Sequence, residues 1–298
     1  MGLIEKEYRN GEVIIAEGES GKNFYRILKG KVGVYADYQK KDHLNLAILG
    51  YGEFFGEMAI LDDYPRSATV VANGDVVVAE IPGDELNVYL EENPDSAIAL
   101  MKLLGGRIQT MAADCKDALN LLSELKEADA NKKKSFFDRI KKHQEIYLNV
   151  KDQIPPPSSE SYLKAFAEIT DEGTGHINVY ESGDVLFREG ETDDCMFILR
   201  EGKVGIYDQS GNKVSELEAV SFMGEMGMIA GEPRDCTVVV ETDDCCIERV
   251  RQDDLEALVR SCPVKVDMIL RHLSFRVRAL TIDFYNTCKE ITERYGEK

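Results

Sequence analysis

The chain has 298 residues, with 55 Asp or Glu against 36 Lys or Arg, and a formal net charge of −19 at pH 7. This length favours two domains, and such an acidic chain is a poor partner for DNA phosphates. No apolar run approaches the roughly 18 residues of a membrane span, and no signal peptide precedes Glu5, so neither a channel nor a secreted protein is expected. The seven cysteines include no CxxC pair, which favours a reducing cytoplasm and argues against zinc or iron–sulfur sites.

The first 50 residues show the spacing of short β-strands. Runs of β-branched and aromatic residues are separated there by glycines and charged clusters, which favours a small sandwich or barrel. The expected strands include residues 13–15, 24–28, 32–35 and 46–48. Gly11, Gly18, Gly30 and Gly33 are each expected to occupy a turn that needs positive φ.

A Gly-Glu pair and a Pro-Arg pair follow these strands. Residues 55–60 are Phe-Gly-Glu-Met-Ala-Ile, and residues 65–70 are Pro-Arg-Ser-Ala-Thr-Val; we call the two segments together the first cassette. This combination suits a small ligand that carries one phosphate and one sugar hydroxyl. The alternative is that the glutamate and the arginine simply pair with each other across the loop.

A long helix is expected from Pro94 onward. Its apolar residues fall at alternating spacings of three and four, a heptad seam of more than three repeats. The seam consists of Met101, Leu104, Ile108, Met111, Cys115, Ala118, Leu122 and Leu125. The first turns can pack on the preceding strands, but the continuation to Leu125 favours pairing with another helix.

The composition changes between residues 128 and 175, a segment that matches no pattern known to us. Lys132–134, Lys141 and Lys142 make a local basic patch, which in this acidic chain we interpret as a solvated helix face. Residues 155–159 predict a stiff, extended spacer, and residues 161–172 a short helix.

The landmarks of the first half then return. Gly30 recurs as Gly202, 172 residues later, and Gly56 recurs as Gly224, 168 residues later. A period above 100 residues indicates duplicated domains, and the loop between these landmarks must be four residues shorter in the second copy. Residues 223–228 (Met-Gly-Glu-Met-Gly-Met) and 233–238 (Pro-Arg-Asp-Cys-Thr-Val) form the second cassette.

A second heptad seam ends the chain. It consists of Leu270, Leu273, Val277, Leu280, Phe284, Thr287 and Ile291. The two long helices are expected to pair either with each other inside one chain or across the two chains of a homodimer. Only seven residues follow Ile291, so no helix-turn-helix domain is expected there.

The two ordered Gly-Glu…Pro-Arg cassettes resemble the cyclic-nucleotide-binding domain family, as in bacterial catabolite activator proteins and regulatory subunits of cAMP-dependent protein kinase. The resemblance covers roughly residues 8–127 and 176–296. It implies a mainly β fold with flanking helices: two tandem, jelly-roll-like β-barrels, each followed by a long helix. The expected domains are residues 1–127 and 176–298, joined by a helical and Pro-rich linker at 128–175.

The same resemblance implies roles for the first cassette. A short helix starting near Gly56 would offer backbone N–H groups to a cyclic phosphate, and Arg66 would pair with its exocyclic oxygens. Glu57 would accept the ribose 2′-hydroxyl, Ala59 would let the backbone approach, and Ser67 would donate a further bond. The expected residues of this site are Gly56, Glu57, Met58, Ala59, Arg66 and Ser67.

The corresponding residues of the second site are Gly224, Glu225, Met226, Gly227, Arg234 and Asp235. Asp235 stands where the first copy has Ser67. It opposes a phosphate if it points inward, whereas it leaves binding intact if it turns outward and caps a local N–H. Gly227 in place of Ala59 is expected to have no effect.

Together these features predict a cytoplasmic regulatory protein that binds a cyclic nucleotide and is not an enzyme. Ser67 favours cAMP, with cGMP or another cyclic nucleotide as alternatives; no cofactor, metal, DNA or membrane is expected. The signal would pass to an unidentified effector protein. The Arg-Arg-x-Ala/Ser inhibitor sequence of the kinase regulatory subunits is missing, which argues against a kinase as this partner. The alternative is a scaffold or oligomerisation protein with degenerate nucleotide pockets.

Overall fold

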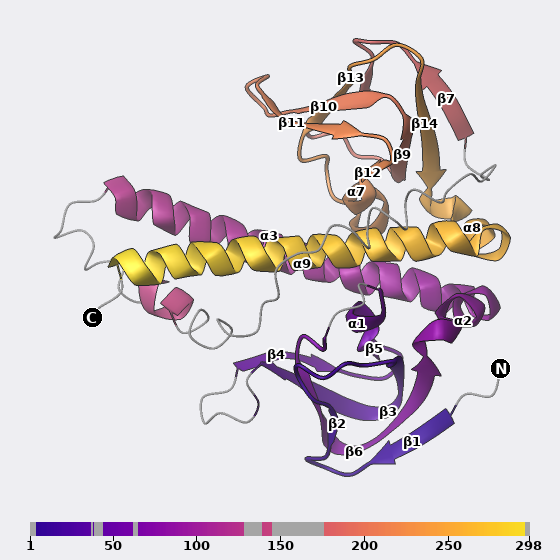
Figure 1. The fold of residues 1–298 in the computed structure, drawn as a ribbon, viewed down its shortest axis with the longest axis vertical. Helices are drawn as coiled ribbons and strands as arrows, with labels where there is room; N and C mark the ends of the chain where they lie inside the picture. The colour runs from indigo at the N-terminus through magenta and orange to yellow at the C-terminus, as the bar shows by residue number, and fades with distance from the viewer. Residues whose placement is uncertain are drawn as a thin grey trace. The chain divides into compact units, whose positions relative to one another are not determined.

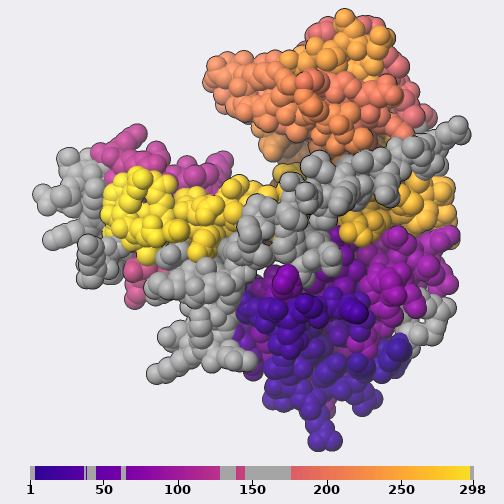
Figure 2. Space-filling model, in the orientation of Figure 1, coloured from indigo at the N-terminus to yellow at the C-terminus, as the bar shows by residue number. Residues whose placement is uncertain are grey.

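A computed structural model describes residues 4–36, 38, 44–61, 65–127, 139–144 and 176–295 of the chain, drawn in colour in Figure 2. The spacer and short helix predicted for residues 155–172, and the lysines at 132–134, lie outside the described residues. By its contacts the chain divides into two compact units. One comprises Met1–Tyr89, Gly106–Ser161 and Leu273–Lys298, and the other Leu90–Gly105 and Tyr162–His272.

The first copy of the repeat folds into one strongly bent, antiparallel sheet (Figure 1). Two 14-residue strands, β3 (Asn23–Ala36) and β6 (Thr69–Pro82), pair along their length. They are flanked by β1 (Ile4–Tyr8) and β4 (Leu44–Leu49), in the order β1-β6-β3-β4. The short strands β2 (Val13–Ile15) and β5 (Phe54–Phe55) add to β6 and β3 respectively. The strands predicted from the sequence are therefore confirmed.

Gly30 marks the bend of β3. Its φ is +85°, and the pairing with β6 shifts register between Ile27 and Lys29 and again between Lys29 and Lys31, across Gly30. Positive φ is also found at Gly11 and Gly18, as predicted. The same prediction is wrong for Gly33, which lies inside β3 opposite Val71. A Cβ on Gly33 would lie 2.5 Å from the Tyr35 ring, so glycine is needed there for space and not for its φ.

In the second copy the long strands are divided and the sheet becomes two. The strands β9 (Cys195–Glu201) and β10 (Lys203–Tyr207) correspond to β3, and β13 (Thr237–Val240) and β14 (Cys245–Arg251) correspond to β6. The remaining strands are β7 (His176–Tyr180), β8 (Val185–Phe187), β11 (Lys213–Glu218) and β12 (Ser221–Met223). The sheet orders are β11-β10-β13-β8 and β12-β9-β14-β7.

The predicted four-residue difference lies in one hairpin loop. In the first copy Tyr35 pairs with Asn45, which leaves residues 36–44 between them. In the second copy Tyr207 pairs with Lys213, which leaves only residues 208–212. Both hairpins have a register shift just before the tyrosine. The prediction of a shorter second loop is confirmed.

Each copy has a buried glutamate at the equivalent position of its last strand, with a different set of partners. Glu80 accepts hydrogen bonds from the Asn23 amide at 2.7 Å and the Tyr25 hydroxyl at 3.1 Å, and pairs with Lys6. The equivalent Glu248 pairs instead with Arg200 at 2.9 Å and with the buried Lys265 at 2.7 Å. A buried carboxylate is tolerated because these donors satisfy it.

Each copy contains one short helix between two of its strands, and its last strand is followed by a 3-10 turn, a second short helix and a long helix. In the first copy these are α1 (Glu57–Leu61), the 3-10 turn η1 (Gly83–Glu85), α2 (Leu86–Glu92) and the long helix α3 (Pro94–Glu127). In the second copy they are α7 (Glu225–Ala230), η3 (Gln252–Asp254), α8 (Leu255–Ser261) and α9 (Pro263–Tyr295). Both long helices begin at a proline, which is favoured at the first helical position. No helix among the described residues is long and apolar enough to cross a membrane.

The C-terminal parts of α3 and α9 pack against each other within one chain (Figure 1). Cys115 contacts the Leu280 carbonyl, and Lys126 pairs with Glu290 at 3.3 Å, so the two helices run parallel. They share one apolar cluster, which also includes Ile140 from the helical residues 139–144: Cys115, Ala118, Leu121, Leu122, Leu125, Ile140, Phe284, Cys288 and Ile291. The seam that continues beyond the first turns is therefore filled by the other long helix.

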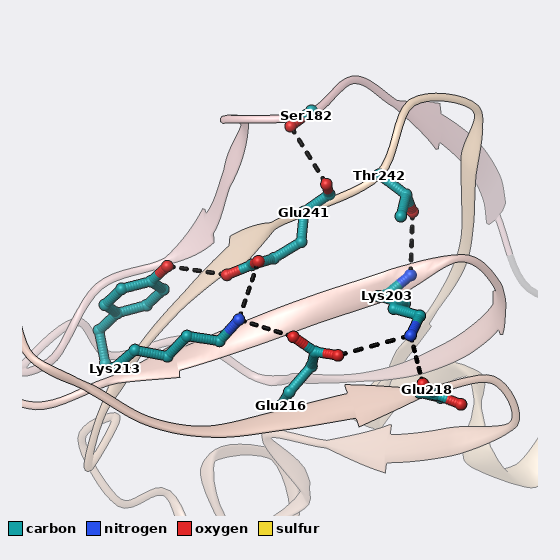
Figure 3. Close-up of polar contacts among 8 residues, drawn as sticks. Ser182, Lys203, Lys213, Glu216, Glu218, Glu241 and Thr242 are labelled. Carbon is teal, nitrogen blue, oxygen red and sulfur yellow. Dashed lines mark hydrogen bonds and ion pairs between the residues drawn. The ribbon is translucent and has the colours of Figure 1, made fainter.

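A network of charged side chains covers part of the second copy's surface (Figure 3). Lys213 binds Glu216 at 2.6 Å and Glu241 at 2.9 Å, and Lys203 pairs with Glu216 and Glu218. These residues come from β10, β11 and the turn after β13, and none belongs to a cassette. Exposed ion pairs of this kind contribute about 0–1 kcal/mol each, so we interpret the network as support for the sheet surface.

Candidate ligand site in each copy

The first cassette begins with a turn that places Glu57 at the start of α1. Gly56 has a φ of +79°, a conformation that an L-residue rarely adopts. The turn carries Glu57 into the interior, where its side chain is 1% exposed. Ala59 is also buried, and Gly56 and Met58 are half-buried. Four of the predicted site residues, at positions 56–59, therefore lie together in one buried or half-buried stretch.

The Arg66 guanidinium is held by two backbone carbonyls, an arrangement that we call the arginine seat. It donates to the Gly56 carbonyl at 2.6 Å and to the Asn23 carbonyl, and the backbone N–H of Arg66 donates to Glu19 at 2.9 Å. The side chain packs directly over Gly21, where an added Cβ would overlap with the guanidinium. These contacts hold a buried cation next to the start of α1.

The charge of Arg66 is not matched by a carboxylate among the described residues. Burial is the largest influence on its pKa and lowers it, against the opposite effects of Tyr25, Glu57 and Glu19. Arginine nonetheless stays protonated in proteins. A desolvated guanidinium held by neutral carbonyls gains more from a bound anion than an exposed one does.

Glu57 has one satisfied oxygen and one unsatisfied oxygen. Its Oε1 accepts a hydrogen bond from Arg107 of α3, while its Oε2 is buried and has no hydrogen-bond partner among the described residues. The expected alternative, a direct bond between Glu57 and Arg66, is not what these contacts show. An unpaired buried carboxylate oxygen costs free energy until a donor reaches it. A ligand hydroxyl is one such donor.

Ser67 differs from the other predicted residues of the first site because it is exposed. It follows Arg66, whose backbone is held by Gly18 and Glu19 on both sides.

In the second cassette Arg234 occupies the equivalent seat. It donates to the carbonyls of Gly224 and Cys195, the counterparts of Gly56 and Asn23. It also bonds a carboxylate: Nη2 and Nε both donate to Asp193, the latter at 3.2 Å. The guanidinium further lies 4.4 Å from the centre of the Phe187 ring, a cation–π contact.

The other residues of the second site are arranged much as in the first. Glu225 is 2% exposed, Gly227 is buried, and Gly224 and Met226 are half-buried. His272 of α9 lies 3.6 Å from Glu225 Oε1. Burial lowers the pKa of His272 to about 4, so its ring is neutral at physiological pH and this contact is not an ion pair.

Asp235 is exposed, like Ser67 in the first copy. Its carboxylate lies close enough to the Cys236 thiol to add to the effect of burial, which is the main cause of a thiol pKa raised to about 12. The carboxylate that meets Arg234 is therefore that of Asp193, a residue outside the cassette.

The described part of the chain contains no group of three or more His, Cys, Asp or Glu side chains that could hold a metal ion. The candidate sites are thus built from one arginine, one glutamate and backbone groups in each copy. This arrangement can bind an anion and a hydroxyl.

Comparison with known proteins decides the family. The model of the cyclic nucleotide-binding domain matches residues 5–93 and 177–262, more than half of the chain. The chain belongs to the cyclic nucleotide-binding domain family. It carries two such domains in tandem, and the predicted mainly β, jelly-roll-like fold with flanking helices is confirmed.

Similar proteins include a kinase and kinase regulatory subunits whose names refer to cyclic nucleotides. The cAMP-dependent protein kinase regulatory subunit of Dictyostelium discoideum is 24% identical over 85% of this chain and 64% of its own length. The cGMP-dependent protein kinase of Plasmodium berghei is 24% identical over 82% of this chain but 22% of its own length. A structure of the Toxoplasma gondii PKA regulatory domain with cAMP is 19% identical, covering 87% of this chain and 82% of that one, with a TM-score of 0.28.

Sequence reasoning missed three residues of these cyclic nucleotide-binding domains. Gly21 and Asp193 occupy matching positions of the 172-residue repeat, so extending the comparison two residues beyond Glu19 and Glu191 would have found the pair. The repeat does not point to Arg107 in this way, because the contact between Arg107 and Glu57 depends on how α3 packs against the cassette.

Proposed function

We propose that the chain is a regulatory cyclic nucleotide sensor with no catalytic or DNA-binding activity of its own. This proposal rests on two side chains of the first domain. Arg66 is buried without a carboxylate partner among the described residues, and Glu57 is buried with one oxygen that has no hydrogen-bond partner there. The first group suits the single negative charge of a cyclic phosphate. The second suits the ribose hydroxyl.

The proposed first site consists of Gly56, Glu57, Met58, Ala59, Arg66 and Ser67. Arg66 would bind the exocyclic phosphate oxygens, and the backbone of the turn at Gly56 would approach the same phosphate. Glu57 Oε2 would accept the 2′-hydroxyl. We propose cAMP as the ligand because Ser67 follows the arginine, with cGMP as the alternative; both nucleotides appear in the names of relatives.

The proposed output is a change in contacts with a partner protein. Ligand binding can drive such a change only if it favours one of two states, and Arg107 connects the proposed site to α3. The relatives are regulatory subunits and a kinase, so a protein kinase catalytic domain is the first partner class to test, although the sequence argued against it. The domain limits at 127 and 176, and a location in the cytoplasm, remain part of this proposal.

Calorimetric titration with cAMP, cGMP and a cyclic dinucleotide tests the proposal. We expect micromolar binding of one mononucleotide and its loss in Arg66→Ala. Arg9→Ala, which changes an exposed arginine of the same domain, is the matched control and should bind normally. Arg66→Lys keeps the charge but not the two-pronged geometry, and should bind measurably more weakly than the wild type if the seat is used as proposed.

A 2′-deoxy analogue tests the role of Glu57 separately. The wild type should prefer cAMP over 2′-deoxy-cAMP by about tenfold or more, since a hydrogen bond to a charged group contributes about 1.5–3 kcal/mol. Glu57→Gln should reduce this preference. No heat and no thermal shift with any nucleotide would instead support the scaffold alternative.

A further inference from the structure

The second domain differs from the first in what its arginine already binds. In both domains the guanidinium donates to two backbone carbonyls, those of Gly56 and Asn23 for Arg66, and of Gly224 and Cys195 for Arg234. The two arginines thus sit in the same seat. Only Arg234 also bonds a carboxylate among the described residues.

That carboxylate belongs to Asp193, which stands where the first domain has Gly21. Asp193 accepts from both Nε and Nη2 of Arg234 through its two oxygens. Its Oδ1 is further bonded by the backbone N–H of Cys195 at 3.1 Å. A two-oxygen pairing of this kind is the geometry that arginine forms with a phosphate.

A second substitution between the domains fits the first. Ala59 of the first domain is Gly227 in the second, and a Cβ at Gly227 would lie 2.9 Å from Arg234 Nη1. In the first domain a Cβ at Gly21 would overlap with the Arg66 guanidinium, and in both domains the turn glycine, Gly56 or Gly224, also lies against the arginine. Each domain therefore has a further glycine next to its own arginine, but at a different position. The first domain combines Gly21 with Ala59, and the second combines Asp193 with Gly227.

We infer that Asp193 is the resident anion of the second domain and takes the place on Arg234 that a cyclic phosphate takes in the first. This inference rests on the proposed function of the first site. A cyclic nucleotide entering the second domain must break the Asp193 pairing and bring a second negative charge beside that carboxylate. The Asp193 carboxylate and the phosphate would both lie next to Arg234, and two negative charges so close together repel strongly in a partly buried site. The second domain therefore binds cyclic nucleotides more weakly than the first, by about 100-fold or more.

The decisive experiment exchanges the two residue pairs and counts ligand equivalents by calorimetry with cAMP. The wild type should bind one equivalent per chain, and Arg66→Ala should remove it. Asp193→Gly combined with Gly227→Ala recreates the Gly21 and Ala59 pair, and should add a second equivalent. Gly21→Asp should abolish binding at the first site. Asp253→Asn removes the charge of an exposed aspartate of the second domain outside both cassettes; it should leave one equivalent and serves as the control.

The outcomes separate the inference from the proposed function. No binding by the wild type would overturn the proposed function. Two equivalents in the wild type, or a single equivalent that persists in the exchanged variant, would overturn the inference alone. Should the exchanged variant fail to fold in a thermal melt, Asp193→Asn keeps the size of the side chain and removes its charge. Measurable second binding in that variant supports the inference, and its absence overturns it.

Discussion

Arg107, near the middle of α3, donates a hydrogen bond to one carboxylate oxygen of the buried Glu57, and the other oxygen has no hydrogen-bond partner in the part of the chain that the structure describes. The negative charge of Glu57 is thereby balanced by a residue of the long helix and not by the arginine of its own cassette. A movement of the Glu57 carboxylate would therefore alter a hydrogen bond to α3.

Arg107→Gln should lower the free energy of unfolding by about 1.5–3 kcal/mol, because a buried carboxylate loses a charged hydrogen-bond donor. Urea denaturation followed by circular dichroism measures this. Lys102→Gln, on an exposed position of the same helix, should change stability by less than about 0.5 kcal/mol. Equal losses in the two variants would show that Glu57 does not depend on Arg107.

Gly30 and Gly74 allow conformational strain to be separated from a steric clash. Both have positive φ, +85° and +88°. A Cβ at Gly74 meets nothing within 4 Å, whereas a Cβ at Gly30 would overlap with the Asp75 carbonyl oxygen. Gly74→Ala should therefore cost about 1–2 kcal/mol from the left-handed conformation, and Gly30→Ala distinctly more. Thermal melts of both variants test this; equal costs would mean that the backbone at Gly30 relaxes freely.

The apolar cluster between α3 and α9 predicts large differences between neighbouring leucines. Leu125→Ala removes a fully buried side chain from the cluster, and we expect a loss of about 2–5 kcal/mol. Leu119→Ala, one turn and a half earlier and 54% exposed, should change stability little. Denaturation curves of the two variants make the comparison, and a similar loss at both positions would contradict the described packing.

Glu80 predicts a pH dependence of stability. Burial by itself raises its pKa, but hydrogen bonds from Lys6, Asn23 and Tyr25 outweigh this effect, and the pKa is lowered from its ordinary value of 4.5. A carboxylate with a lowered pKa stabilises the fold above its unfolded-state pKa, and this contribution is lost as pH falls through the lower folded-state value. The melting temperature should thus fall more steeply below pH 4.5 in the wild type than in Glu80→Gln. A constant difference between the two proteins across this range would contradict the assignment.

Much of the fold was predictable because it depends on short-range patterns that the chain states twice. Short runs of β-branched and aromatic residues predicted the strands, and the two cassettes marked the turns into α1 and α7. The difference between the 172- and 168-residue offsets predicted a shorter loop in the second copy. Gly33 shows the limit of this reasoning. Glycine was expected to supply a positive φ there, but what decides its identity is the Tyr35 ring lying over its backbone.

The sequence by itself determined the duplication, the family resemblance and the presence of one arginine and one glutamate in each cassette, since these follow from residue identity and spacing. Only the tertiary structure decided what each charge meets. Asp193 is 41 residues from Arg234 along the chain, and Arg107 is 50 residues from Glu57. The apolar seam of α3 packs against α9, the last helix described. Ion pairs and side-chain packing act over a few ångströms in space, and the distance between two residues along the chain does not set their distance in the fold.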